Sequence, residues 1–376
     1  MIKKDNPGRK DESSQKCCGD SSCCGGTAKK AVKYNENPSW KIGVVETSAG
    51  LIHKISSRLT KKDIFGAWKV RWGLRRMAYM IKPGLYAVGN PTDNSPVLVT
   101  ANYKLSFDRL RQELSGLDAW ILILDTKGIN VWCAAGKGTF GTEEIIRRIH
   151  LVNLDRIVNH REIILPQLGA PGVAAHEVGK STGFKVTYGP VRASDLPVFL
   201  KEGMQAQPGM RRVKFTIRDR LALVAVDLVR PIIILAALFA LVLLFRAAGI
   251  HVISLHDVFF FGGTVFTGAV LAPVFLPWIP GRSFALKGWQ LGILWVALIF
   301  VYYSWIVGSP LGWEQMIAYL LTLPALSAFL TLNFTGASTF TSLSGVVKEM
   351  MIAIPLIILS FSAGILLWFA MAFIKF

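Results

Sequence analysis

Cys133 is the side chain whose position in the sequence most clearly suggests chemistry. It follows the apolar run Trp120–Leu124 and the loop Asp125–Asn130. An uninterrupted apolar run of this length is typical of a strand buried on both faces of a sheet. Because ligand sites in open α/β sheets lie beyond the carboxyl ends of such strands, we expect the thiol to lie where a ligand binds.

Asn130 is suited to cap a short helix that has residues 131–133 in its first turn and is ended by Gly136 and Gly138. Such a helix places the sulfur near unpaired backbone N–H groups and the positive end of the helix dipole, which favours the thiolate. A thiolate binds a metal or attacks an electrophile. On spacing alone, however, a lone cysteine beside Trp and Ala is more often a small buried hydrophobic residue.

Strand-like and helical segments alternate around this motif, which predicts a doubly wound, Rossmann-like α/β domain at residues 39–205 with a parallel sheet. The predicted strands are Leu85–Val88, Val97–Thr100, Trp120–Leu124, Glu162–Leu165 and Phe184–Tyr188. The predicted helices are Phe107–Leu114, a helix that begins near Thr142 and includes Ile145–His150, and a helix that runs toward Lys180.

The amino-terminal residues 1–38 contain too few apolar side chains to repay the entropy cost of ordering, and we interpret them as a flexible tail. They carry the paired vicinal thiols Cys17, Cys18, Cys23 and Cys24. Soft metal ions prefer thiolates, so this cluster could capture a metal substrate; a zinc-binding or passive thiol tail is an open alternative. The first twenty residues lack the apolar core of a secretory signal.

A basic linker at residues 206–220 precedes a region, residues 221–376, in which five apolar segments are each long enough to span a bilayer. The predicted spans lie near 223–245, 257–279, 289–307, 314–333 and 350–373. Arg and Lys residues precede the first span and lie between the second and third, whereas Gly308–Trp313 carries no positive charge. The positive-inside rule therefore predicts a multi-pass protein of the inner (cytoplasmic) membrane with the amino-terminal domain in the cytoplasm.

Few ionisable residues fall inside the predicted spans. Asp227 and Arg230 are spaced to pair on one helix face, and we expect an ion pair near the headgroups and not a transport path. The net charge of +18 could also suit nucleic acid. We expect no nucleic-acid partner, because neither interleaved basic and aromatic residues nor a recognised motif accompanies the charge.

Asn130–Lys137 resembles the cap-helix signature of the mercury-methylating corrinoid protein family (HgcA-like). Three further segments, Val97–Tyr103, Asp118–Gly128 and Leu165–His176, resemble the corrinoid domain that this family shares with the large subunit of the corrinoid iron-sulfur protein of acetyl-CoA synthesis. That protein is soluble and lacks the cap-helix cysteine. The five predicted spans fit the mercury family.

The resemblance implies a corrinoid (cobalamin) bound in its base-off form, with the Cys133 thiolate as lower axial ligand of cobalt. It implies a corrinoid-dependent methyltransferase that moves a methyl group from the Cys-ligated methylcorrinoid to inorganic Hg(II), giving methylmercury. A thiolate ligand raises the charge on the methyl carbon. The resemblance also implies a ferredoxin-like iron-sulfur electron donor and a methyl donor system linked to folate.

Roles for individual residues follow from the same resemblance. The cap over the ring is formed by Asn130, Val131, Trp132, Cys133, Ala134, Ala135, Gly136 and Lys137. Thr100, Asn102 and Thr126, at strand ends, are expected to hydrogen-bond the corrin amides, and Gly169, Ala170, Gly172 and Val173 to admit the nucleotide tail through close backbone approach. We expect His176 to be a surface or tail contact and not an axial ligand.

Two other functions remain open on the sequence. The first is a membrane-bound corrinoid methyl carrier of one-carbon metabolism, which does not need a thiolate on cobalt. The second is a membrane metal-binding or transport protein that works through its tail cysteines. The first alternative uses the same domain. The second requires polar groups in the membrane spans, which the predicted spans do not contain.

Overall fold

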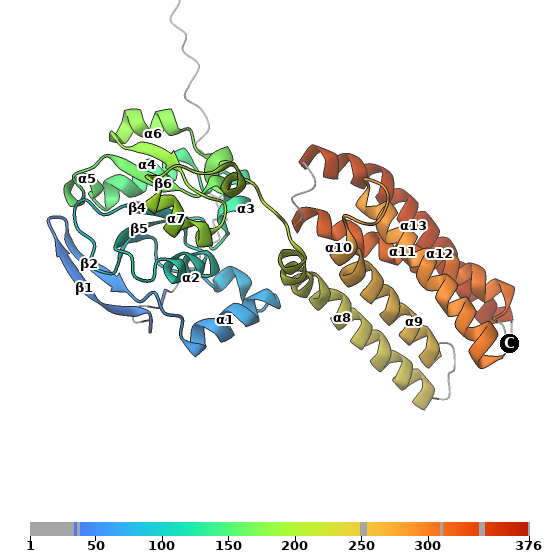
Figure 1. Ribbon diagram of the computed structural model, residues 1–376. Coiled ribbons are helices and arrows are strands. Elements are labelled where there is room, and N and C mark those ends of the chain that lie inside the picture. Colours follow the sequence, from blue (N-terminus) through green and yellow to red (C-terminus); the bar gives the residue numbers. More distant parts are fainter. Residues whose placement is uncertain (1–33, 36–37, 249–253, 309–310, 338–342, 375–376) are drawn as a thin grey trace, which may run out of the picture. The chain divides into compact units, whose positions relative to one another are not determined.

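The computed structural model describes residues 34–35, 38–248, 254–308, 311–337 and 343–374. These residues form an α/β domain, shown in blue to green in Figure 1, and a set of long apolar helices, shown in yellow to red. The predicted thiol cluster at Cys17–Cys24 lies outside the described residues.

The α/β domain is built on a seven-stranded sheet with the order β1-β2-β3-β5-β4-β6-β7. Its strands are β1 Lys41–Thr47, β2 Gly50–Ile55, β3 Gly84–Val88, β4 Val97–Ala101, β5 Ala119–Leu124, β6 Glu162–Leu165 and β7 Lys185–Tyr188. Its helices are α1 Lys61–Arg71, α2 Lys104–Glu113, α3 Val131–Gly136, α4 Thr142–Leu151, α5 Leu154–Ile157, α6 Ala175–Thr182 and α7 Leu196–Lys201. The five predicted strands and the predicted helices are present.

The sheet is mixed, so the prediction of a parallel sheet is confirmed for β4, β5, β6 and β7 among themselves and is wrong for β1 and β3. The pairs β4–β5, β4–β6 and β6–β7 are parallel, but β3 pairs antiparallel with β5 through partners such as Tyr86 and Ile121. The reason lies in the connection from β3 to β4 at residues 89–96, which contains no helix. A parallel crossover needs about a dozen residues or more, so this short connection reverses the chain.

Both faces of the central strands are buried, as the apolar runs predict. In β5, Trp120 and Leu122 pack with α4 and α6 on one face, whereas Ile121 and Ile123 pack with α2 and α7 on the other. Successive strand residues point to opposite faces, so one apolar run supplies two cores. The central strands therefore form a rigid base whose carboxyl ends can position a site.

Five described helices are long and apolar enough to cross a membrane, at Ile217–Ala247, His256–Phe275, Phe284–Val307, Trp313–Gly336 and Ser344–Met371. They correspond in order to the five predicted spans. Small residues allow close packing between α11 Phe284–Tyr302 and α12 Trp313–Asn333: a Cβ at Gly292 would lie 2.5 Å from Pro324 Cα. The remaining long helices are α8 Ile217–Ala247, α9 Leu255–Phe266 and α13 Leu343–Ile374.

The expected ion pair between Asp227 and Arg230 is not formed. Oδ2 of Asp227 is buried without a hydrogen-bond partner, and no salt bridge joins the two residues in the described part of α8. Their spacing of three residues permits contact on a helix but does not enforce it, because both side chains have other rotamers.

Candidate functional site: a cavity beside the cysteine-bearing helix

Helix α3 begins where the sequence predicts. Asn130 has an extended backbone, and its side-chain Oδ1 accepts a hydrogen bond from the backbone N–H of Cys133 at 3.0 Å. The helix ends at Gly136, and Gly138 adopts a left-handed conformation (φ +75°) that suits glycine. The capped first turn therefore fixes the backbone that carries the thiol.

The side chains of α3 divide between the core and the surface at helical spacing. Val131, Ala134 and Ala135 are buried against the core of the sheet. Trp132 is 36% exposed, and Cys133 carries a free thiol and is partly exposed. The inner face of the helix thus packs against the sheet, and the thiol lies accessible between the buried and the exposed face.

Asn102 holds the loop that leads into this helix. The residue is completely buried, and its Oδ1 accepts hydrogen bonds from the Thr126 hydroxyl at 2.9 Å, the Gly128 N–H at 2.9 Å and the Thr126 N–H at 3.2 Å. Its Nδ2 donates to Asp125 at 3.2 Å. The Thr126 hydroxyl also donates to the carbonyl of Ile129 at 2.7 Å. Asn102 and Thr126 therefore tie the end of β4 to the loop before α3.

Two neighbouring residues in this loop have left-handed backbones, Lys127 (φ +56°) and Gly128 (φ +73°). Glycine is required at position 128 for a second reason, because a Cβ there would lie 2.9 Å from Met80 Cε and 3.1 Å from the Met77 carbonyl oxygen. The segment that follows α1 thus packs directly on the loop before the cysteine-bearing helix.

Glu144, in the first turn of α4, stabilises the end of β5. Its Oε1 accepts the Asp125 N–H at 2.8 Å and pairs with Arg148 at 2.6 Å. Burial raises the pKa of this carboxyl, but the Asp125 N–H and the guanidinium groups of Arg148 and Arg147 outweigh burial and lower the pKa overall. The carboxylate is therefore ionised at neutral pH and holds strand, loop and helix together.

Gly169 and Gly172 lie in the short 3-10 helix η2 Gln167–Gly172, which packs against α3. A Cβ at Gly172 would lie 2.3 Å from the Phe140 carbonyl oxygen and 3.0 Å from Ala135 Cα, and a Cβ at Gly169 would lie 2.5 Å from the Phe140 ring. The space beside these glycines is therefore filled by the segment 135–140. Their small size lets η2 approach α3 closely.

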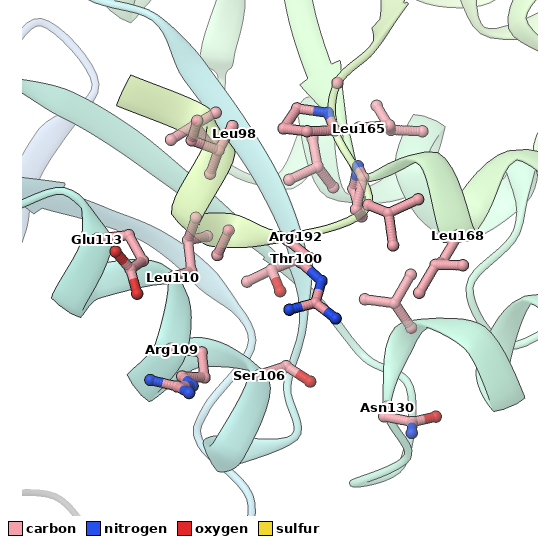
Figure 2. A pocket seen from close by; sticks show the side chains of 18 of the residues that line it. Leu98, Thr100, Ser106, Arg109, Leu110, Glu113, Asn130, Leu165, Leu168 and Arg192 are labelled. Carbon is pink, nitrogen blue, oxygen red and sulfur yellow. The ribbon is translucent and has the colours of Figure 1, made fainter. Parts of the chain in front are cut away.

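A cavity of about 470 Å³ opens at the carboxyl ends of β4, β6 and β7, next to the start of α3 (Figure 2). Its apolar lining includes Leu98, Val99, Leu110, Ile164, Leu165 and Leu168. Its polar lining includes Thr100, Tyr103, Ser106, Arg109, Glu113, Asn130 and Arg192. Figure 2 shows Ser106, Arg109, Leu110 and Glu113 projecting from α2, with Thr100, Asn130 and Arg192 on other elements around the same hollow.

The structure brings together only part of the predicted site at this cavity. Thr100, Asn130, Val131 and Trp132 line it, and Cys133 follows them in the same helical turn without lining the cavity itself. Asn102 and Thr126 bond to each other inside the protein and do not line the cavity.

The other predicted site residues lie away from the cavity. Ala134 and Ala135 face the core, Lys137 is exposed, and the segment Gly169–Val173 packs beside α3. His176 lies on the surface, with its side chain 72% exposed and 3.9 Å from Glu177.

Tyr103 is a cavity residue that our sequence reasoning did not single out. Burial raises the pKa of its phenol; a hydrogen bond and charge from Arg76 oppose that rise, and the charge of Cys133 adds to it. The phenol is therefore neutral at physiological pH and lies within electrostatic reach of the thiol. Its place next to Asn102, just beyond the end of the buried strand β4, was the available signal.

Comparison with known proteins assigns this domain to a class. Residues 75–200 match the family described as CO dehydrogenase/acetyl-CoA synthase delta subunit. The α/β domain thus contains a domain of that family, and α3 lies within the matched segment. The five long apolar helices lie outside it.

Curated relatives agree with this assignment. The chain is 35% identical over 127 residues to the acetyl-CoA decarbonylase/synthase complex subunit gamma of Methanopyrus kandleri, covering 33% of this chain and 27% of the relative. It is 30% identical over 129 residues to the corresponding subunit of Archaeoglobus fulgidus, covering 34% and 27%. It is 31% identical over 126 residues to the corrinoid/iron-sulfur protein large subunit of Moorella thermoacetica, covering 33% and 28%. The chain thus spans about a quarter of the length of these relatives.

Proposed function

We propose that this chain is a membrane-anchored corrinoid-dependent methyltransferase that transfers a methyl group to inorganic Hg(II), giving methylmercury. The observation that carries the proposal is the partly exposed thiol of Cys133 on a capped helix beside the cavity, in a domain homologous to a corrinoid protein. The particular reaction rests on the resemblance of Asn130–Lys137 to the cap-helix signature of the mercury-methylating family.

The cavity suits one part of a corrinoid. Its lining combines apolar and polar side chains, and its volume of about 470 Å³, within the range of about 300–1,000 Å³ typical of small-molecule sites, can enclose only part of so large a cofactor; Cys133 lies beside it and not in its lining. A corrin ring has apolar faces and amide groups at its edge, which Thr100, Ser106 and Asn130 could hydrogen-bond. Cys133 adds a single sulfur donor, which suits a metal ion whose other ligands belong to a macrocycle.

Each part of the site has a proposed task. Cys133 would hold the cobalt of a base-off corrinoid through its thiolate. Asn130 holds the Cys133 backbone N–H, and Asn102 holds the loop before it, so the sulfur is presented from a preorganised turn. When bound, the corrinoid supplies a cobalt-held methyl group for transfer to Hg(II).

The surroundings of the thiol favour its role as a donor. Tyr103 is uncharged at neutral pH and adds no negative charge beside the sulfur. Val131, Ala134 and Ala135 pack the helix against the sheet and exclude water from its inner face. Access of a metal to the thiol is therefore from the outer side of the turn.

We further propose a ferredoxin-like iron-sulfur protein as electron donor and a methyl donor system linked to folate. The name of the Moorella thermoacetica relative, a corrinoid/iron-sulfur protein large subunit, supports an iron-sulfur partner. The five apolar helices and the basic segment before α8 support a cytoplasmic domain anchored in the inner membrane. The tail cysteines Cys17, Cys18, Cys23 and Cys24 are proposed to capture Hg(II).

A second candidate is a membrane-bound corrinoid methyl carrier of one-carbon metabolism. The observation that favours it is the similarity of residues 75–200 to acetyl-CoA decarbonylase/synthase subunits. The two functions separate on Cys133, because a carrier that passes methyl groups to nucleophiles does not need a thiolate on cobalt.

The test uses the full-length protein in detergent, reconstituted with cobalamin under reducing conditions. The visible absorption spectrum is compared between the native chain and Cys133→Ala, and Hg(II) methylation is measured with both. We expect a cofactor spectrum in both proteins, a shift of its bands on loss of the sulfur, and loss of methylation in the variant.

A matched control replaces the four tail cysteines by serine and leaves Cys133 intact, and it should keep the native spectrum. Unchanged bands in Cys133→Ala would remove the axial ligand from the proposal. The carrier function would be established instead by two results together. The native chain would not methylate mercury, and Cys133→Ala would still transfer methyl groups to a thiol acceptor. Failure of the native chain to take up cobalamin would refute both.

A further inference from the structure

Helix α1 is fixed to the α/β domain by its inner face. Asp63 pairs with Lys104 at 2.6 Å and with the buried Arg111 at 2.9 Å, and both partners belong to α2. Gly66 lies against Tyr79, where a Cβ would come within 2.6 Å of the phenol oxygen. Val70 is buried in the core. These contacts determine which side of α1 points outward.

The outward side of α1 carries large apolar side chains. Ile64 is 60% exposed, Phe65 is 56% exposed and Trp68 is 54% exposed. The rings of Phe65 and Trp68 stack with centroids 6.0 Å apart, and Trp72 continues the row at 6.0 Å from Trp68. Aromatic rings exposed in a row on one helix face have no packing role in the domain that carries them.

Basic side chains surround this aromatic row. Lys61, Lys62, Lys69 and Arg71 are exposed, and the Lys69 ammonium lies 4.5 Å from the centroid of the Phe65 ring. Asp63, the acid in this helix, is buried and paired. The expectation that basic and aromatic residues do not interleave is therefore wrong for α1. We call Lys61, Lys62, Ile64, Phe65, Trp68, Lys69 and Arg71 the basic aromatic face.

The chain itself keeps this face near the apolar helices. The domain's last helix, α7, ends at Lys201, and α8 begins at Ile217. A connection of about 15 residues reaches at most about 50 Å even when fully extended. If α8 crosses a bilayer, the tether keeps the α/β domain within reach of that bilayer's surface, and contact of the basic aromatic face with the surface becomes an intramolecular event.

We propose that the basic aromatic face binds the surface of an anionic phospholipid bilayer, so that α1 lies in the headgroup region. Helices of this kind bury aromatic and aliphatic side chains about 5–10 Å into the interface while Lys and Arg contact anionic headgroups. Trp and Lys are the residues favoured at that depth, because each combines an apolar body with a polar end. The proposal rests on the membrane anchoring in the proposed function and is independent of the corrinoid.

Lipid contact here has a consequence for the site. The segment after α1 packs on the loop before α3, where Met77 and Met80 meet Gly128. Binding of α1 to the bilayer therefore restrains the segment with Met77 and Met80, which contacts the loop before the cysteine-bearing helix α3.

The test places the photoreactive amino acid benzoylphenylalanine at position 65 in the full-length chain, reconstituted in nanodiscs of phosphatidylcholine with or without phosphatidylglycerol. A matched control carries the same probe at position 151, because Leu151 is 60% exposed on α4 of the same domain. We expect lipid adducts at position 65, at least fivefold more than at position 151, and a further increase with the anionic lipid. Retention of the protein in the nanodisc after a salt wash tests separately whether the apolar helices are inserted in the bilayer.

The charge requirement is tested by the fourfold variant Lys61→Gln, Lys62→Gln, Lys69→Gln, Arg71→Gln in the same nanodiscs. A basic side chain near an anionic surface contributes about fivefold to binding, so the lipid adduct should fall at least fivefold. Equal adduct yields at positions 65 and 151 would refute the proposal, as would an adduct with a copurifying protein or nucleic acid in place of lipid. Loss of the protein from the nanodisc during the salt wash would refute the membrane anchoring itself.

Discussion

The side-chain oxygen Oδ1 of Asn130 lies 3.0 Å from the backbone nitrogen of Cys133 and accepts its hydrogen bond. One residue thus both starts helix α3 and holds the residue that carries the thiol. Because a capped first turn frays less, the position of the sulfur depends on a side chain that need not touch any ligand.

Replacing Asn130 by Ala removes this cap and should destabilise α3 by about 1 kcal/mol. Hydrogen exchange of the amides in Val131–Gly136 should become faster, and the reconstituted protein should bind cobalamin more weakly. Asn130→Ser is the matched control, because serine caps equally well without adding charge, and it should retain native exchange. Slow exchange in Asn130→Ala would show that packing alone holds the helix.

The sequence was sufficient for features that depend on local patterns. The apolar run Trp120–Leu124 predicts a strand buried on both faces, and the spacing of Asn130 before Cys133 predicts the cap. The five long apolar segments are visible because a bilayer demands about 20 apolar residues in succession.

Features that depend on partners distant in the sequence could not be predicted. The reversal of β3 follows from its pairing with β5, which no local pattern of Gly84–Val88 reveals. Asn102 looks like a ligand contact at a strand end, but its partners Thr126 and Gly128 lie more than twenty residues further along the chain. The approach of the Phe140 carbonyl and of Ala135 to Gly172 is likewise a contact that no local pattern around Gly172 reveals.

Asn102 is expected to support the site through the loop. Asn102→Ala leaves the buried Gly128 N–H without its acceptor, whereas the Thr126 N–H and hydroxyl keep the carbonyls of Leu124 and Ile129. The free energy of unfolding should fall by about 2 kcal/mol. The loss should appear in denaturant unfolding without any corrinoid present. Thr100→Ala, at a polar side chain that lines the cavity, serves as comparison. If Asn102→Ala weakened cobalamin binding alone, a direct ligand contact would be indicated instead.

The ion pairs of Asp63 should make the domain sensitive to acid. Although burial raises the pKa of this carboxyl, hydrogen bonds and charge from Lys104, together with hydrogen bonds from Thr60, lower it from 3.8 to about 2. A folded-state pKa below the unfolded value means that the stabilisation is present above pH 3.8 and is lost as the pH falls toward about 2. Its size is about 2 kcal/mol.

Unfolding measured between pH 5 and pH 2 tests this dependence. Asp63→Asn should be less stable than the native chain at pH 5 by about 2 kcal/mol, because Lys104 and Arg111 each lose one of two carboxylate partners and keep Asp108. The variant should also lose less stability on acidification, with the remaining loss coming in part from Glu144, whose pKa is also lowered. Asp155→Asn, at an exposed position, should behave like the native chain; parallel pH profiles for native and Asp63→Asn would contradict the prediction.

Gly172 should be intolerant of even the smallest side chain. A methyl group there would meet the Phe140 carbonyl oxygen at 2.3 Å and Ala135 Cα at 3.0 Å, so either η2 or α3 must move. Overpacking of this kind costs about 1–3 kcal/mol. We therefore expect Gly172→Ala to lower stability and to displace the turn that carries Cys133, which the rate of thiol modification by a maleimide reports. Gly209→Ala is the control, because a Cβ at Gly209 meets nothing within 4 Å. An unchanged modification rate together with lost cobalamin binding would mean that Gly172 makes room for the ligand and not for the helix.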